Sequence, residues 1–276
     1  MICQAYAKIN LTLEILGKRD DGYHELRSVM RRIAIHDTLI LEEAHDIHIT
    51  CDAPGLTGPQ NLAYRAAVRL KQATAYTSGA IIAIKKAIPI AAGLGGGSSD
   101  GAAALVGLNA LWHTGLSRDA LATLAADLGS DLPFFLWGGM ALVEGRGERV
   151  RSLYSLPACQ VLLVRPPIEV STAAVYGHIT PDGFSNGTTS ERLMALPPDT
   201  TPEHWLLCND LQAVTCRLFP LVQEVLGFLA LCGATQWQMC GSGPTCFALF
   251  TDDHEATRAA ERARARGWDA WITEFV

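Results

Sequence analysis

The chain has 276 residues, of which 49% are hydrophobic and 18% are charged, a composition that excludes a disordered protein. Its net charge of −6, without any basic stripe, argues against a nucleic-acid-binding protein. The length fits one large domain or two of ordinary size.

The cysteines and the N-terminus indicate where the protein resides. None of the eight cysteines forms a C-x-x-C pair or has zinc-ligand spacing, which favours free thiols in a reducing compartment. The first residues, MICQAYAKIN, lack the charged and apolar regions of a signal peptide, and no apolar run approaches the length of a membrane span. We therefore expect a cytoplasmic protein without membrane or nucleic-acid partners.

The N-terminal half of the sequence predicts strands mixed with helices. Residues 9–15 alternate apolar and polar side chains, as in a half-buried strand. By the same patterns, further strands are expected over 37–43, 46–52 and 80–88, helices over 61–74, 101–113 and 117–129, and a hairpin over 140–150.

The C-terminal half predicts a second unit of helices and strands. Residues 179–203 are rich in Pro, Gly, Ser and Thr and predict a long irregular loop. Around it, strands are expected over 160–167 and 268–276, helices over 211–233 and 254–267, and a strand–loop–strand unit over 235–250. We predict an α+β protein with two domains, residues 1–155 and 156–276.

The segment PIAAGLGGGSSD (residues 89–100) is the strongest local signal. It lacks the lysine of a P-loop, and Ser98 stands where a dinucleotide-binding G-x-G-x-x-G motif needs glycine. A tight turn needs only one or two glycines, and each ordered glycine costs roughly 0.5–1 kcal/mol relative to alanine. Consecutive glycines let backbone N–H groups converge on an anion at a helix N-terminus, so the segment predicts a phosphate site.

Ser98 and Ser99 extend this prediction. Their hydroxyl groups stand where they can contact a phosphate or a magnesium ion, and the alternative for either serine is to cap the following helix. Which of the two contacts the metal stays open at this point.

Two other segments carry candidate functional residues. Lys8 and Asn10 lie on the same side of a predicted strand because side chains alternate. A lysine among apolar residues needs a partner or a function, although an exposed edge-strand lysine is the alternative. The late Gly-Ser-Gly turn at 241–243 lies between two predicted strands, and a simple β-turn would also explain it.

Together the three segments resemble the GHMP small-molecule kinase family, which shares a lysine-bearing N-terminal strand, the motif P-x-x-x-G-L-G-S/G-S-S and a late glycine turn. The resemblance is strongest over residues 5–30, 86–105 and 128–147. There AKINLTLEILGKRDDGYHEL, PIAAGLGGGSSD and LGSDLPFF match the branch that phosphorylates a cytidine-diphosphate derivative of methylerythritol. It implies an N-terminal ATP-binding domain like domain 2 of ribosomal protein S5 and a C-terminal ferredoxin-like α/β domain.

The resemblance also implies a reaction: transfer of the γ-phosphoryl group of ATP, with Mg²⁺, to the 2-hydroxyl of the methylerythritol unit in non-mevalonate isoprenoid synthesis. Asp131 would accept the hydroxyl proton, Lys8 would keep that carboxylate ionised, and Asn10 would orient the substrate. Tyr23 and His24 would contact the cytosine, with Tyr176 on its opposite face. ATP would bind at Asn61, Leu62, Lys86, Pro89, Gly93, Leu94, Gly95, Gly96, Gly97, Ser98, Ser99 and Ser242.

Two alternatives stay open. Another kinase of the family, of the homoserine or mevalonate type, would not need Tyr23 and His24. A non-catalytic phosphate-binding protein would keep the glycine segment but would not need Lys8 and Asp131, and Asp131 by its spacing alone would also serve as a helix cap.

Overall fold

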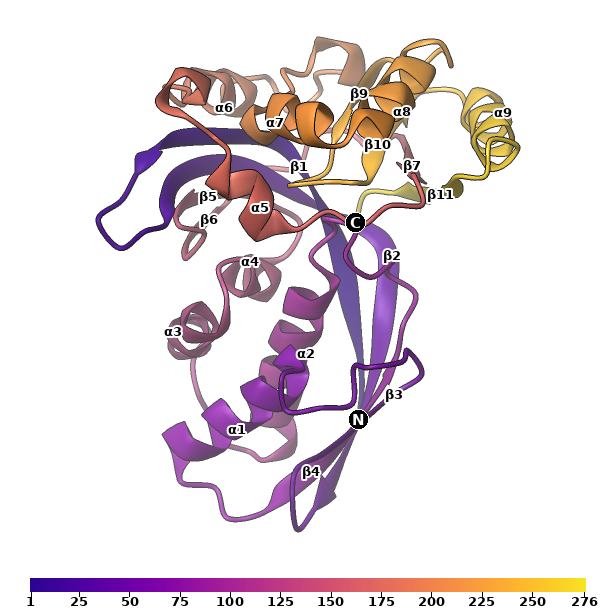
Figure 1. Cartoon of the computed structure of the whole chain (residues 1–276). Helices are drawn as coiled ribbons and strands as arrows, with labels where there is room; N and C mark the ends of the chain where they lie inside the picture. Colours follow the sequence, from indigo (N-terminus) through magenta and orange to yellow (C-terminus); the bar gives the residue numbers. More distant parts are fainter.

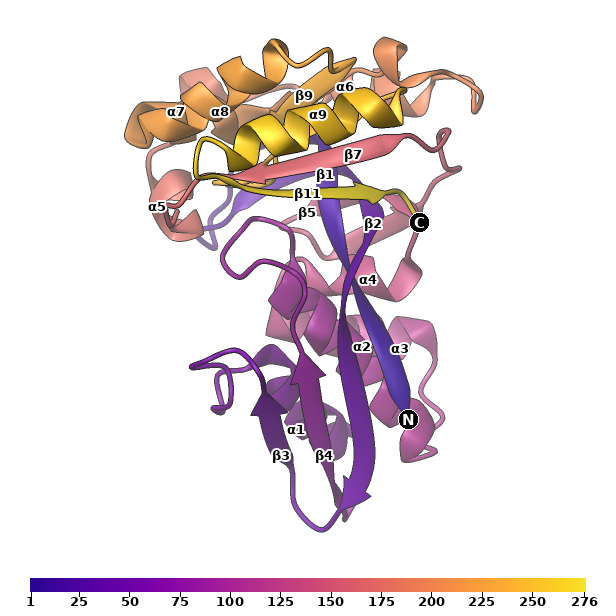
Figure 2. The ribbon, with the colours of Figure 1, turned by 90° about the vertical axis from the view of Figure 1, so that its right-hand side faces the viewer.

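A long β-hairpin joins the lower and upper halves of the computed structural model, which describes all residues 1–276 (Figure 1). The hairpin consists of β1 (Ile2–Lys18) and β2 (His24–Ala44), which pair antiparallel along most of their length. Figure 2 shows both strands running from the lower half to the upper half. Residues far apart in the hairpin therefore contact different parts of the protein.

β2 is the central strand of a seven-stranded sheet. Its first half pairs with β5 and its second half with β4, while β8, from the C-terminal half of the chain, pairs in parallel with β1. The other strands of this sheet are β3 (His48–Cys51), β4 (Gly79–Lys85), β5 (Met140–Gly145), β6 (Arg149–Ser152) and β8 (Cys208–Asn209).

Four helices cover one face of the lower half (Figure 1). The Asn61 side chain accepts a hydrogen bond from Ala63 N (2.8 Å) at the start of the first helix, and the Ser117 side chain caps the third in the same way, by accepting from Ala120 N. The second helix is buried along most of its length. These helices are α1 (Leu62–Thr74), α2 (Gly96–Leu111), α3 (Arg118–Leu128) and α4 (Leu132–Trp137).

The upper half is built on a four-stranded antiparallel sheet in the order β11–β7–β10–β9. Its strands are β7 (Gln160–Arg165), β9 (Gln236–Met239), β10 (Cys246–Phe250) and β11 (Asp269–Glu274). Its helices are α5 (Thr172–Gly177), α6 (Thr188–Met194), α7 (Asp210–Leu218), α8 (Pro220–Ala230) and α9 (Asp253–Arg264). No single helix is long and apolar enough to cross a membrane; α7 and α8 reach that length and composition only when taken together, with a bend of 120° between them.

The hairpin and the upper sheet share one buried apolar cluster. It includes Ile9 and Leu11 of β1 together with Leu163 of β7 and Phe247 of β10. The prediction of a half-buried strand over 9–15 is therefore wrong, because the face that the alternation assigns to solvent is covered as well, by α6 where Thr12 and Glu14 contact Ser190. The polar residues of β1 are buried as well: Lys8, Asn10, Thr12 and Glu14.

Four other predicted elements differ from the structure. The helix predicted over 211–233 is two helices, α7 and α8, with a bend of 120° between them. Residues 37–43 are the second half of β2 and not a separate strand. The helix predicted from residue 101 begins at Gly96, inside the glycine segment. The predicted loop 179–203 contains α6 and two short 3₁₀ turns, Pro181–Gly183 and Pro202–His204. Contacts with β1 hold α6 in place, and the local sequence does not show them.

The division into domains at residues 155 and 156 stays a proposal. All strands of the upper sheet come from residues after 156, and all but one strand of the larger sheet come from residues before it. The exception is β8, which joins the larger sheet from the C-terminal part of the chain. The two parts therefore interlock at β1.

Candidate active site

Lys8 occupies the buried centre of the site, with a side chain that is 4% exposed. Its Nζ donates hydrogen bonds to Asn10 Oδ1 (2.8 Å) and to the carbonyl of Gly93 (3.2 Å), and it lies 3.5 Å from Asp131 Oδ2. Asn10 in turn donates to Ser28 Oγ at 2.8 Å. The prediction that Lys8 and Asn10 share one side of the strand is confirmed.

Two glycines give the loop before α2 its backbone path. Gly93 and Gly95 have φ angles of +76° and +75°, a region that favours glycine. A Cβ at Gly93 would lie 2.4 Å from the carbonyl oxygen of Cys240, and one at Gly95 would lie 2.8 Å from Phe135 Cζ. The loop therefore packs too closely between the late turn and α4 for side chains at these two positions.

The next two glycines form the first turn of α2. No side chain caps this helix, so backbone N–H groups at its N-terminus lack side-chain acceptors. A Cβ at Gly96 would point toward Ile88 Cγ2 at 3.0 Å, whereas one at Gly97 would meet only Leu62 Cδ1 at 3.8 Å. Of the two, Gly97 is the position that leaves open space.

The two serines differ in orientation. Ser99 is buried, and its hydroxyl donates to the carbonyl of Tyr6 at 2.7 Å. Ser98 faces the cavities described below. Neither serine caps α2, because Gly95 occupies the N-cap position. Ser98 is therefore the serine that can contact a ligand through its side chain.

The late glycine turn closes over the same centre. A Cβ at Gly241 would lie 3.2 Å from the Gly93 carbonyl oxygen and 3.6 Å from Lys8 Nζ. Asn209 donates to the carbonyl of Gly241 at 2.8 Å, and the hydroxyl of Ser242 lies 2.8 Å from that of Thr172. The three segments singled out in the sequence thus meet at one place.

Two cavities adjoin at this centre. The loop cavity, of about 460 Å³, lies between Lys8, the glycine segment and the start of α1. The hairpin cavity, of about 890 Å³, lies between the β1–β2 turn, α5 and residues 179–184. Both cavities are lined by the same five residues: Leu26, Ser98, Asp131, Thr172 and Tyr176. Asp131 therefore stands where the contents of the two cavities would meet.

Every predicted site residue except Ser99 lines one of these cavities. Sequence reasoning missed Asp37, Asp100, Arg146 and Phe184. Arg146 lies at the tip of the predicted hairpin, and Phe184 lies in the segment predicted as a loop. Asp100 ends the glycine segment itself, whereas no local pattern distinguishes Asp37, Arg146 and Phe184, which the tertiary fold alone brings to the site.

The sequence matches the family described as GHMP kinases N terminal domain over residues 61–139 and the one described as GHMP kinases C terminal over residues 201–268. The 4-diphosphocytidyl-2-C-methyl-D-erythritol kinase of Pelotomaculum thermopropionicum is 46% identical over 266 residues, which span 94% of this chain and 92% of the relative. The chain belongs to this kinase family. The family expected from the sequence, the two-part GHMP fold and an ATP-dependent kinase activity are confirmed with it.

Solved structures agree with this membership of the GHMP kinases. A crystal structure of 4-(cytidine 5'-diphospho)-2C-methyl-D-erythritol kinase superposes with a TM-score of 0.85 at 36% identity, and the match covers 100% of this chain and 99% of that one. Homoserine kinase from Cytophaga hutchinsonii gives a TM-score of 0.76 at 18% identity, covering 100% and 93%. The second similarity shows the shared fold only.

Lys86 lies in a buried network beside the kinase's glycine loop. Its Nζ bonds to Asp37 Oδ2 and to Asp100 Oδ2 (2.7 Å), while Asp37 Oδ1 accepts from Ala87 N (2.6 Å) and Ile88 N (2.8 Å). Burial alone would lower the pKa of Lys86, but the two carboxylates outweigh it and raise that pKa. The lysine proposed as a nucleotide contact thus also helps to fix the start of the loop.

His24 lies among aromatic rings in the hairpin cavity. The ring centroid of Tyr176 is 5.5 Å from that of His24, and Phe184 meets His24 edge-on at 6.1 Å. Burial, together with the charge of Lys18, lowers the pKa of His24. The imidazole is therefore neutral at neutral pH and carries one hydrogen-bond donor and one acceptor.

The carboxyl group of Asp100 predicts a pH dependence of stability. Burial raises the pKa of Asp100 to about 7, against the opposing effect of Lys86. The folded protein therefore keeps a proton that the unfolded chain releases near pH 4, so this group lowers the free energy of unfolding as pH rises from about 4 to about 7. Asp100→Asn lacks that slope. The free energy of unfolding of the variant, relative to that of the parent protein, should therefore increase by about 1–3 kcal/mol from pH 5 to pH 8.

Denaturant unfolding of both proteins at the two pH values measures this difference. If the gap between Asp100→Asn and the parent were the same at both values, the carboxyl group would be ionised throughout.

Proposed function

We propose that this chain transfers the γ-phosphoryl group of ATP to the 2-hydroxyl of 4-diphosphocytidyl-2-C-methyl-D-erythritol, a step of non-mevalonate isoprenoid synthesis. The observation that carries the proposal is the Lys8–Asp131 pair, 3.5 Å apart, at the junction of the two cavities. One cavity is lined by a glycine loop suited to phosphates and the other by aromatic and basic side chains.

Asp131 is the proposed base for the hydroxyl proton. Its side chain is 35% exposed and faces both cavities, so it can reach a hydroxyl group in one and a phosphoryl group in the other. Lys8 pairs with the carboxylate at 3.5 Å and offsets negative charge that develops on the transferred group. Asn10 fixes the direction of the lysine ammonium through their hydrogen bond of 2.8 Å.

The loop cavity is the proposed ATP site. Backbone N–H groups at the start of α2 would hold the phosphates, with Asn61, Leu62 and Lys86 nearer the nucleoside. The hydroxyl of Ser98 is an oxygen donor of the kind that Mg²⁺ prefers, and with the ATP phosphates it would hold that ion. When bound, Mg²⁺ neutralises phosphate charge.

The hairpin cavity is the proposed site of the cytidine substrate. His24 would contact the polar edge of the cytosine, with Tyr23, Tyr176 and the newly found Phe184 supplying aromatic faces. Lys18 and Arg146 line the same cavity, and their positive charges suit a diphosphate group. A cytoplasmic location without nucleic-acid or membrane partners belongs to the same proposal, since both substrates are charged small molecules.

The decisive experiment incubates the wild-type protein with labelled ATP, Mg²⁺ and a panel of alcohols that includes the cytidine substrate, homoserine and mevalonate. Phosphorylation of the cytidine substrate alone is the expected result. Transfer to homoserine or mevalonate instead would reassign the chain to another branch of the GHMP kinases, and no transfer to any alcohol would favour a phosphate-binding protein without catalysis.

Asp131→Asn should abolish most of the turnover. A positioned base contributes about 10²–10⁴-fold in rate, and asparagine cannot accept the proton. The ATP dissociation constant should stay close to that of the wild type, because the glycine loop holds the phosphates. Steady-state kinetics and a nucleotide-binding titration check both statements, and full turnover in the variant would rule out Asp131 as the base.

Gly97→Val tests the loop cavity as the ATP site. A side chain at this position meets only Leu62 Cδ1, at 3.8 Å, so the fold tolerates valine while its methyl groups enter the cavity. We expect ATP affinity to fall about tenfold or more without a loss of thermal stability. Gly227→Val, at an open position in α8, is the control. Normal ATP affinity in Gly97→Val would contradict the assignment.

His24→Ala should raise the KM for the cytidine substrate about tenfold, because an unpaired buried base edge costs about 1–3 kcal/mol. The KM for ATP should not change, since His24 lines the hairpin cavity only. His48→Ala, on the exposed strand β3, is a matched control. A parallel loss of affinity for both substrates in His24→Ala would argue against a role in reading the base.

A further inference from the structure

Residues 179–184 form one wall of the hairpin cavity. They belong to no sheet and to no long helix. Four of these residues line the cavity: Ile179, Thr180, Pro181 and Phe184. The chain continues from this wall into α6. What holds α6 therefore also limits where the wall can lie.

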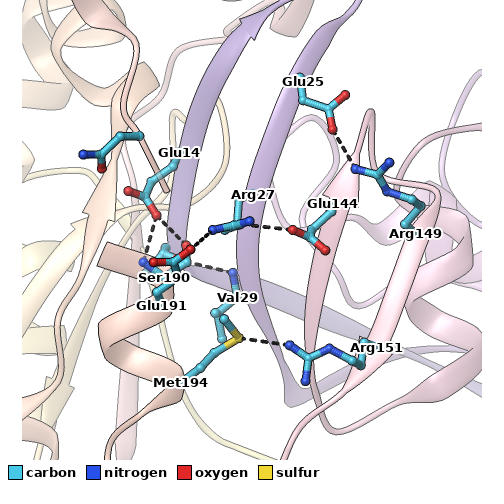
Figure 3. A network of polar contacts seen from close by, with 12 residues as sticks. Glu14, Glu25, Arg27, Val29, Glu144, Arg149, Arg151, Ser190, Glu191 and Met194 are labelled. Atoms are coloured by element: carbon cyan, nitrogen blue, oxygen red, sulfur yellow. Dashed lines mark hydrogen bonds and ion pairs between the residues drawn. The ribbon is translucent and has the colours of Figure 1, made fainter. Parts of the chain in front are cut away.

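A buried carboxylate of β1 holds the start of α6 (Figure 3). Glu14 is 1% exposed, and its Oε1 accepts from Thr189 N at 3.2 Å. Its Oε2 accepts from both the backbone N (2.8 Å) and the hydroxyl (2.6 Å) of Ser190. No basic side chain forms an ion pair with Glu14, so these three donors are what compensate its burial.

A second contact fastens the wall itself to the neighbouring residue of β1. Ser185 N donates to the carbonyl of Ile15 at 2.9 Å, and Ser185 Oγ donates to Asp210 Oδ1 at 2.8 Å. Asp210 Oδ2 accepts from Ile15 N at 2.7 Å, which closes the set. Phe184 directly precedes Ser185 and meets His24 edge-on, so this contact fixes the aromatic side of the cavity.

The outer side of α6 carries a different kind of contact. Arg27 of β2 bridges Glu144 of β5 and Glu191 of α6 at the surface, and the Glu191 side chain is 60% exposed (Figure 3). Exposed ion pairs of this kind contribute little to stability. The buried contact through Glu14 and the exposed one through Glu191 thus attach the same helix with unequal strength.

We propose that Glu14 is a positioning residue for the alcohol substrate: by anchoring α6 to β1, next to the Ser185–Asp210 contact, it holds Phe184 and the wall 179–184 against His24. The proposal rests on the proposed function, because it assigns the wall to the cytidine moiety. It also explains the carboxylate. Glutamine has the same shape but would direct an amide NH₂ at N–H or O–H donors, so one side of the anchor would lose its acceptor.

The test compares Glu14→Gln with Glu191→Gln, the matched change on the exposed side of the same helix. In Glu14→Gln the KM for the cytidine substrate should rise about tenfold, while kcat and the KM for ATP stay unchanged. Glu191→Gln should behave as the wild type. Hydrogen exchange should become faster in residues 179–194 of Glu14→Gln and in no other segment.

Ser185→Ala gives a second, milder variant that removes one hydroxyl beside the wall, and its cytidine KM should rise about threefold. A wild-type protein that does not phosphorylate the cytidine substrate would refute the proposed function. An active wild type with an unchanged cytidine KM in folded Glu14→Gln, or in Ser185→Ala if Glu14→Gln does not fold, would overturn the positioning role. Equal rises in the KM for ATP and for the cytidine substrate would overturn it too, because they would indicate a general structural defect.

Discussion

The buried ammonium group of Lys8 is the interaction on which the site depends. Removed from water, it needs acceptors, and it finds them in Asn10 on its own strand, in the carbonyl of Gly93 in the glycine loop and in Asp131 at the start of α4. These acceptors come from three separate segments of the chain. Satisfying one charge therefore brings the proposed base, the phosphate loop and the strand into one arrangement before any ligand binds.

Strand β1 performs several functions because both of its faces are covered. Lys8 and Asn10 point to the centre of the site, whereas Thr12 and Glu14 contact Ser190 of α6, with 2.7 Å between the two hydroxyl oxygens. In an exposed strand such polar residues would bond to water and would need no partner in the protein. Here each buried polar group needs a partner, so a run of alternate residues connects the loop cavity with the wall of the hairpin cavity.

The glycine segment likewise divides its functions among its members. Gly93 and Gly95 adopt positive φ angles and pack so closely against the late turn and α4 that side chains there would clash. At Gly96, a side chain would crowd Ile88. Only Gly97 leaves space open toward the loop cavity. The network of Lys86 with the carboxyl groups of Asp37 and Asp100 fixes the residues just before this loop. The phosphate binding proposed for this loop therefore depends on the packing of residues 86–88, which precede it, as much as on the loop itself.

The sequence by itself determined the local features of this kinase: the helices over 61–74 and 117–129, the glycine segment, the shared side of Lys8 and Asn10, and the family motifs. These depend on neighbouring residues and on strand or helix periodicity, which a sequence displays directly. Only the tertiary structure decided that β1 is buried on both faces, that α6 forms within an apparent loop, and that Phe184 and Asp37 belong to the site. Each of these depends on contacts between residues far apart in the chain, and the physical reason is burial: the segments that cover a strand, and not its local sequence, determine which polar groups lose water and must find a partner.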